Sequence, residues 1–239
     1  MAEKETELGG TNDRFPPTRW SLIRSAGEAS SPQFHSSLDH LARLYWRPVY
    51  AYFRRKWNLS NEEAKDLTQD FFRSLCEKEV LARLTPERGR FRSYVLAALD
   101  NFARERHRSQ GALKRGGGAL TFSLDAVEGF DPPDGDPPDR IFLREWTRTV
   151  VQDAAAEMER EGAKGYPLLL ARDLAPQEGE DAGYEALSRR FGISVPDVTV
   201  TLYRARRRLR ELILERVRDS VTTSEEAEAE FRELFGSGA

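Results

Sequence analysis

The sequence predicts an all-α protein built from two small helical domains joined by a flexible acidic linker. Charged residues make up 32% of the 239 residues, apolar residues recur three to four positions apart, and one Pro-, Gly- and Asp-rich segment interrupts that period. A chain of this length suffices for two small domains. The expected segments are a disordered tail over 1–17, a helical domain over 18–110, the linker over 111–139, a second helical domain over 140–220 and an acidic extension over 221–239.

The first domain is predicted to be a series of amphipathic helices. In "PQFHSSLDHLARLYWRPVYAYFRRKW" the apolar residues at helical spacing are Leu38, Leu41, Tyr45, Val49, Tyr52 and Phe53. Ser60 and Glu63 form a capping box, so a new helix begins after Ser60. Its inward stripe is Ala64, Leu67, Phe71 and Leu75, and a further helix follows in "RFRSYVLAALDNFARERHR".

Basic charge is concentrated in two stretches, although the whole chain has a net charge of -3. Arg88 to Arg115 contains eight Lys and Arg residues against two acidic ones, and Tyr184 to Arg218 contains nine Arg against four. The second part of the linker is acidic and contains no basic residue; its acids are Asp125, Glu128, Asp131, Asp134, Asp136 and Asp139. Two basic faces are the expected footprint of a nucleic-acid-binding protein with two contact points.

A helix-turn-helix is predicted within the second basic stretch. Residues 184–191 form a short helix, and Gly192 can adopt the left-handed conformation that ends it. Ser194 then caps a second helix and Asp197 occupies its third position, a variant of the capping box. The inward stripe of the second helix is Val198, Leu202, Ala205, Leu209 and Leu212.

The opposite face of that second helix combines groups that read base edges with groups that bind phosphates. Arg204 and Arg207 suit guanine edges or phosphates, and Val200 suits a thymine methyl group. The expected DNA contacts are Pro196, Thr199, Val200, Tyr203, Arg204, Arg207 and Arg208, with Arg206 and Arg210 on phosphates. The alternative is an ordinary solvated basic face, but the capped turn and the preceding short helix favour DNA binding.

Three segments together resemble extracytoplasmic-function sigma factors of the sigma-70 family, which direct bacterial RNA polymerase to promoters. "EEAKDLTQDFFRSL" resembles region 2.2, "RGRFRSYVLAALDNFARERHR" resembles regions 2.3 and 2.4, and "ISVPDVTVTLYRARRRLREL" resembles the end of region 4. The resemblance implies that the first domain binds core polymerase and melts the -10 promoter element. It implies that the second domain reads the -35 element, and that the linker threads towards the active centre.

Site residues in the first domain follow from this resemblance. The surface that binds core polymerase maps onto Asp66, Gln69, Asp70 and Arg73, with a solvated helix face as the alternative. Phosphorylation of Thr68 within that surface would tune binding through its added charge. The -10 contacts map onto Tyr94, Asn101, Arg104, Arg106 and Arg108, where Tyr94 either stacks on a flipped base or belongs to the core.

Two features depart from the family pattern. Thr199 and Thr201 stand where many members carry Lys or Arg, so an unusual promoter sequence or weaker binding is expected. The acidic extension after Ser220 is additional, and we expect it to fold back on the basic helix and restrain it.

Several other function classes are excluded at this level. One cysteine allows no internal disulfide, and the acidic N-terminus and short apolar runs predict no signal peptide, no membrane partner and a cytoplasmic location. No nucleophile, metal-ligand or phosphate-loop motif predicts an enzyme, a cofactor or a small-molecule substrate. The expected partners are core RNA polymerase, promoter DNA and a regulatory protein such as an anti-sigma factor or a kinase. The alternatives are a sigma-mimicking adaptor and a stand-alone helix-turn-helix DNA-binding regulator.

Overall fold

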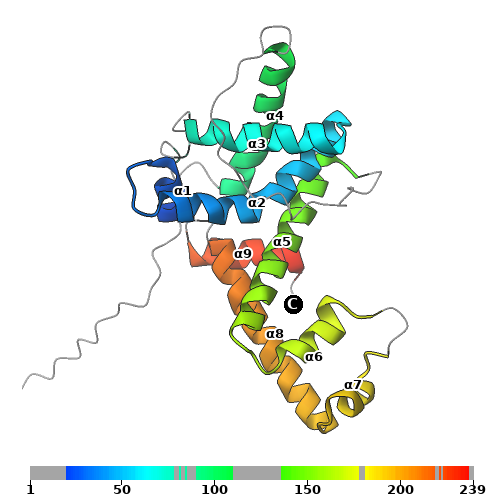
Figure 1. Ribbon diagram of the computed structural model, residues 1–239. Coiled ribbons are helices and arrows are strands. Elements are labelled where there is room, and N and C mark those ends of the chain that lie inside the picture. The colour runs from blue at the N-terminus through cyan, green and yellow to red at the C-terminus, as the bar shows by residue number, and fades with distance from the viewer. Residues whose placement is uncertain are drawn as a thin grey trace, which may run out of the picture.

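The computed structural model describes residues 20–77, 81, 84, 90–109, 136–177, 181–218, 221 and 223–236. All regular structure within these ranges is helical, which confirms the all-α prediction (Figure 1). The helices are α1 (Trp20–Gly27), α2 (Phe34–Trp57), α3 (Asn61–Glu77), α4 (Phe91–Ser109), α5 (Pro138–Arg160), α6 (Tyr166–Leu169), the π-helix η4 (Leu170–Leu174), α7 (Tyr184–Phe191), α8 (Val195–Arg218) and α9 (Ser224–Phe235). In these ranges no helix is both long and apolar enough to cross a membrane. Most of the predicted linker, residues 111–135, lies outside the described residues.

The turn between α2 and α3 is determined by local hydrogen bonds. Asn58 ends α2 in a left-handed conformation, with φ of 47°. The Ser60 backbone N–H donates to the Glu63 carboxylate at 2.9 Å, and the Glu63 N–H donates to the Ser60 hydroxyl at 3.4 Å. These two bonds are the predicted capping box, and the hydrogen bond from the Ser60 hydroxyl lowers the pKa of the Glu63 carboxyl.

Helix α2 lies at the centre of the larger hydrophobic core. Its predicted apolar stripe is buried as expected, but Trp46, Tyr50 and Ala51 on other sides of the helix are buried too. The reason is that α2 is covered on one side by α1 and α3 and packs along α5 on another. Because α2 is enclosed in this way, every residue from Pro48 to Phe53 is buried, so a single stripe describes this part of the helix incompletely.

Helix α5 shares this core with α2 rather than starting a separate one. Phe142 and Trp146 are fully buried, and their rings lie 6.5 Å and 6.4 Å from the ring of Tyr45. The Arg47 guanidinium also donates to the buried Glu145 carboxylate at 2.7 Å. The predicted boundary between residues 139 and 140 therefore does not separate two independently packed cores, because α5 needs α2 to bury its aromatic residues.

Helix α8 runs from this shared core to a second, smaller one. Near its C-terminal end, Leu212 and Val217 are buried in the larger core, whereas Val198 and Leu202 near its start pack with Leu168 and Leu187 in the smaller core. Gly165, just before α6, permits close approach to α8, since a Cβ there would lie 2.8 Å from the Cβ of Ala205.

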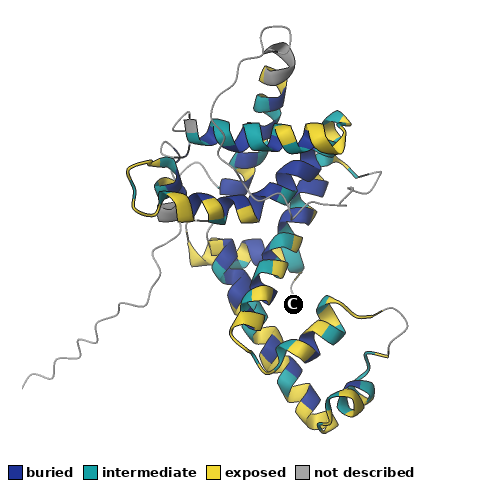
Figure 2. Cartoon of the chain, in the orientation of Figure 1, coloured by how far each residue is buried: buried dark blue, intermediate teal, exposed yellow. Residues whose placement is uncertain are grey.

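The arrangement places two kinds of surface far apart. Helices α3 and α4 lie at one end of the molecule, and α7 with the start of α8 forms the other end (Figure 1). Burial is concentrated along α2 and the second half of α8, while the tip made by α7 and the start of α8 is mostly exposed (Figure 2). Helices α5, α8 and α9 connect the two ends.

Candidate nucleic-acid interface

The predicted helix-turn-helix is present, with α7 and α8 joined by a three-residue turn. Gly192 ends α7 with φ of 66° and ψ of 31°, the left-handed conformation that glycine adopts without strain. The Ser194 hydroxyl accepts the backbone N–H of Asp197 at 3.2 Å and donates to the Asp197 carboxylate at 2.6 Å. The cap confirms the sequence prediction and fixes the direction in which α8 leaves the turn.

The first half of α8 presents an exposed face beyond this turn. Tyr203 is 66% exposed and Val200 is 46% exposed, and with Val195 they are three of the four exposed large hydrophobic side chains among the described residues. Pro196, Thr199, Arg204 and Arg207 are exposed alongside them. Arg207 lies 3.3 Å from Glu211, while Arg204 has no ion pair among the described residues. This face therefore offers apolar, hydroxyl and cationic groups side by side.

Three other arginines of α8 are paired with carboxylates. The Arg206 guanidinium donates to both oxygens of Asp173, at 2.7 and 2.9 Å, and that of Arg208 donates to both oxygens of Glu161, at 2.6 and 3.3 Å. These bonds raise the pKa of both arginines and lower the pKa of Glu161. Arg208 thus differs from its predicted role as an available DNA contact, since its charge is already matched within the chain.

Arg210 is the third paired arginine. Its guanidinium donates to Glu228 of α9 at 2.8 Å and lies over the Phe231 ring, 4.6 Å from the ring centroid. A phosphate group at Arg206, Arg208 or Arg210, which the sequence suggests, would therefore compete with a carboxylate that already binds each of these arginines.

The residues predicted to contact the -10 element lie along α4. Tyr94 is half-buried and its ring stacks on Phe91, with centroids 6.2 Å apart, so its packing is that of a residue at the edge of the core. Asn101 is exposed, and Arg104 is exposed with its guanidinium 3.7 Å from Asp100. Arg106 and Arg108 lie on the same helix, but their side chains are outside the described residues.

Asp100 anchors the exposed part of α4 to α2. It accepts the buried Tyr52 hydroxyl at 2.6 Å, and Lys56 lies 3.7 Å away on the same helix as Tyr52. Burial and the negative charge of Asp100 raise the pKa of Tyr52, so the phenol remains a proton donor. Asn101 and Arg104 therefore project from a helix that is held in a defined position.

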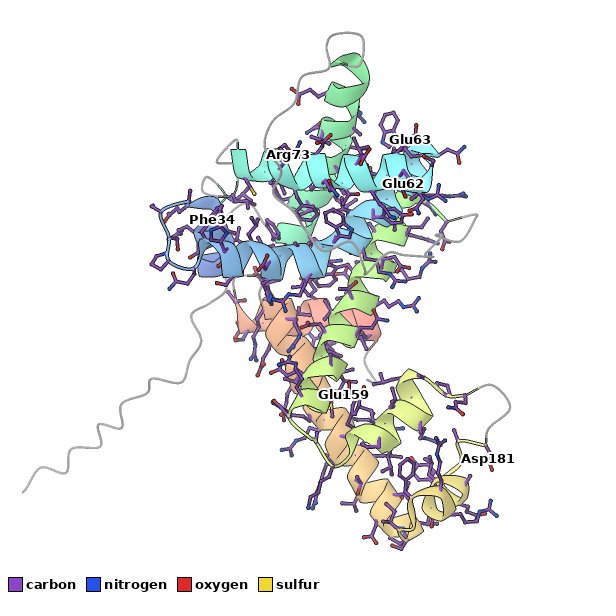
Figure 3. All side chains as sticks on the ribbon, viewed as in Figure 1. Phe34, Glu62, Glu63, Arg73, Glu159 and Asp181 are labelled. Atoms are coloured by element: carbon purple, nitrogen blue, oxygen red, sulfur yellow. The ribbon has the colours of Figure 1, made fainter. Side chains whose placement is uncertain are left out.

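The residues predicted to bind core polymerase lie together on α3, but they are not equally accessible. Asp66 is exposed, whereas Gln69, Asp70 and Arg73 are half-buried. Asp70 and Arg73 are paired at 2.8 Å. Figure 3 shows Glu62 and Glu63 at the start of α3 and Arg73 further along it, so acidic groups dominate the first turns of this helix.

Thr68 does not lie on the exposed face of α3, and the prediction that it is an accessible phosphorylation site is wrong for this structure. The side chain is fully buried, and its hydroxyl donates to the Ala64 carbonyl oxygen at 2.7 Å. A kinase cannot reach a hydroxyl that is bonded within the core. The helical period already indicated this, because Thr68 lies four residues after Ala64 and three before Phe71, on the inward stripe.

Two arginines that were not predicted as site residues form an enclosed cationic group near α4. Arg90 and Arg92, at the start of this helix, are paired with Glu230 and Glu233 of α9. Their side chains are respectively 33% and 7% exposed. The high basic count of residues 88–115 included them, but the carboxylates that bind them lie more than a hundred residues further along the chain.

Comparison with protein-family models, with curated proteins and with solved structures finds no match to this chain. Within the described residues, no group of three or more His, Cys, Asp or Glu side chains could hold a metal ion. What the site offers is one exposed helix-turn-helix face, a second polar and basic helix at the opposite end of the molecule, and an acidic face on α3.

Proposed function

We propose that this protein is a bacterial RNA polymerase sigma factor of the extracytoplasmic-function type. The observation that carries this proposal is the capped helix-turn-helix whose second helix exposes Val200, Tyr203, Arg204 and Arg207. A DNA-reading helix inserts its N-terminal part into the major groove, so the exposed groups lie where base contacts are made. The -35 element is the part of the promoter assigned to this face.

The second contact with DNA is assigned to α4. Asn101 and Arg104 are exposed on a helix that the Tyr52–Asp100 hydrogen bond holds against α2. Strand separation at the -10 element needs polar and aromatic groups that receive unstacked bases, because each flipped base costs a few kcal/mol. Tyr94 is half-buried against Phe91, so base stacking on Tyr94 would require its ring to move.

Binding of core polymerase is assigned to α3. Asp66 is its most accessible candidate, and the Asp70–Arg73 pair would have to rearrange if both residues contact a basic partner helix. The proposed protein performs no chemistry of its own. It supplies promoter recognition and strand separation to the polymerase.

The test is transcription of genomic DNA by purified core polymerase, with and without this protein, followed by mapping of RNA 5′ ends. We expect new start sites that share two upstream sequence elements. Arg204→Ala should reduce these starts while leaving the complex with core polymerase intact. Asp70→Lys should weaken the complex, so the two variants separate DNA reading from polymerase binding.

The other outcomes identify the two alternative functions. A stable complex with core polymerase but no new start sites would indicate a sigma-mimicking adaptor. Neither start sites nor a complex, but DNA binding that falls steeply with salt, would indicate a stand-alone regulator. A protein with six to ten phosphate contacts loses about 10³–10⁵ in affinity between about 50 and 200 mM salt. A flat salt response would contradict DNA binding in every form.

A further inference from the structure

The acidic extension at the C-terminus forms a capped amphipathic helix, α9, that is built into the fold. The Thr223 hydroxyl accepts the Glu226 N–H at 3.1 Å and the Glu226 carboxylate accepts the Thr223 N–H at 3.3 Å, a complete capping box. Ala227 and Phe231 are buried in the larger core against α8. Helix α9 packs against α8, away from the exposed tip (Figure 1).

The acidic side chains of α9 are directed at arginines from two different helices. Glu233 binds Arg90 at 2.7 Å and Arg92 at 3.5 Å. Glu230 lies 2.6 Å from the Nε atom of Arg92 and 3.4 Å from that of Arg90. On the same helix, Glu228 binds Arg210 of α8. Three carboxylates of one short helix therefore neutralise three arginines that belong to the two basic stretches of the sequence.

The two arginines only partly offset the cost of burying the Glu230 carboxylate. Its carboxylate is fully buried, which raises the pKa of Glu230 despite the two arginines. Among the described residues neither oxygen of this carboxylate has an aligned hydrogen bond, and neither does the Arg92 Nε atom. Trp146 of α5 lies beneath the Arg92 guanidinium, 5.6 Å from it, and holds it in place. The Arg92 guanidinium is thus held between the Trp146 ring and the carboxylates of Glu230 and Glu233.

From these contacts we propose that Arg90 and Arg92 form a phosphate-binding site for DNA, and that α9 is an acidic clasp which covers this site and competes with DNA for it. The proposal rests on the proposed function, because it names a further part of the same DNA interface. A phosphate group accepts the same paired hydrogen bonds from arginine as a carboxylate, so the backbone of DNA can replace the glutamates one for one. DNA binding at α4 then displaces α9, and α9 weakens DNA binding in the free protein.

The test compares two glutamates of α9 in the full-length protein. Glu233→Gln removes the carboxylate that binds Arg90 and Arg92, and Glu225→Gln removes an exposed carboxylate from the same helix with the same change in charge. Affinity is measured by fluorescence anisotropy with a mixed-sequence duplex of about 30 base pairs at about 50 mM salt. We expect Glu233→Gln to bind about fivefold more tightly than Glu225→Gln, because opening the clasp no longer breaks these pairs.

A second pair of variants shows whether the gain acts through the proposed site. Arg90→Ala added to Glu233→Gln should remove most of the gain and make the dependence of affinity on salt less steep by about one phosphate contact. Glu230→Gln should give a larger gain where the protein still folds, as judged by circular dichroism. Equal affinities for Glu233→Gln and Glu225→Gln, or a gain that survives Arg90→Ala, would overturn the clasp while leaving DNA binding in place. No DNA binding by any form would overturn the proposed function, and the clasp with it.

Discussion

The arginines of α8 differ sharply in their surroundings. Near the middle of the helix, Arg204 and Arg207 are exposed beside Tyr203, and the ion pair of Arg207 is with its own helix neighbour Glu211. Near the C-terminal end, Arg216 is 5% exposed and bonds both Asp153 and Glu157 of α5. The exposed arginines offer their charge to the surroundings, whereas Arg216 uses its charge to fix helix packing.

This difference shows that a run of arginines does not have one role. Residues 204–210 contain five arginines, and three of them, Arg206, Arg208 and Arg210, bind carboxylates from three other segments of the chain. The number of positive charges in the sequence therefore overestimates the number that DNA can reach in the free protein. Experiments on individual arginines can separate the structural group from the exposed group.

The largest effect on stability is expected from Arg216→Ala. Removing this guanidinium leaves the Asp153 and Glu157 carboxylates close together without their cation. The Arg216 side chain that alanine replaces is almost fully buried. Breaking a buried ion pair from one side costs about 3 kcal/mol, at the low end of the usual range because both carboxylates are partly exposed. The free energy of unfolding in urea measures this loss. Arg207→Ala is the matched control and should change it by less than about 0.5 kcal/mol.

The next effect is on DNA binding rather than on stability. If the proposed function is correct, Arg204→Ala should weaken DNA binding by about tenfold to a hundredfold, since a base-reading arginine contributes about 1–3 kcal/mol. Its free energy of unfolding should stay the same because the side chain is exposed. Arg208→Ala should cost less affinity, because Arg208 is already bound to Glu161. Equal losses of DNA affinity for Arg204→Ala and Arg208→Ala would show that exposed and carboxylate-bound arginines of α8 contribute alike to DNA binding.

A smaller effect is expected at Gly192, in the turn that sets the direction of α8. Gly192→Ala should reduce the free energy of unfolding by about 1 kcal/mol, because alanine is strained in the left-handed conformation. No atom lies within 4 Å of the position a Cβ would take, so the cost comes from the backbone alone. Gly192→Asn should cost less, since asparagine tolerates this conformation better. Urea unfolding of the two variants in parallel measures the difference.

The smallest effect concerns the pair between Arg208 and Glu161 and depends on pH. Because Arg208 holds the pKa of Glu161 below its ordinary value of 4.5, the pair stabilises the fold when Glu161 is ionised in both folded and unfolded chains. The stability difference between the natural protein and Glu161→Gln should be present at neutral pH. It should shrink as the pH falls below 4.5 and through the lowered pKa of Glu161. A difference that grows on acidification would contradict this assignment.

The local features of the candidate site were predictable because short-range interactions determine them. The capping boxes at Ser60 and Ser194, the left-handed Gly192 and the inward stripe of α8 each depend on residues within a few positions of one another. Hydrogen bonds and helical spacing over so few residues are the same in almost any surrounding fold. Sequence by itself therefore determined the helix-turn-helix and which face of its second helix is exposed.

The remaining features depended on contacts between residues far apart in the chain, and only the tertiary structure decided them. Most of helix α5 follows the boundary predicted at residue 139, yet its Phe142 and Trp146 pack against Tyr45 of α2. The partners of Arg90 and Arg92 lie more than a hundred residues away in α9. Helical period shows which residues turn inward, but not which helix they meet, because many helices present an apolar face of similar width. Packing therefore decided which arginines are buried in pairs and which remain available to a partner.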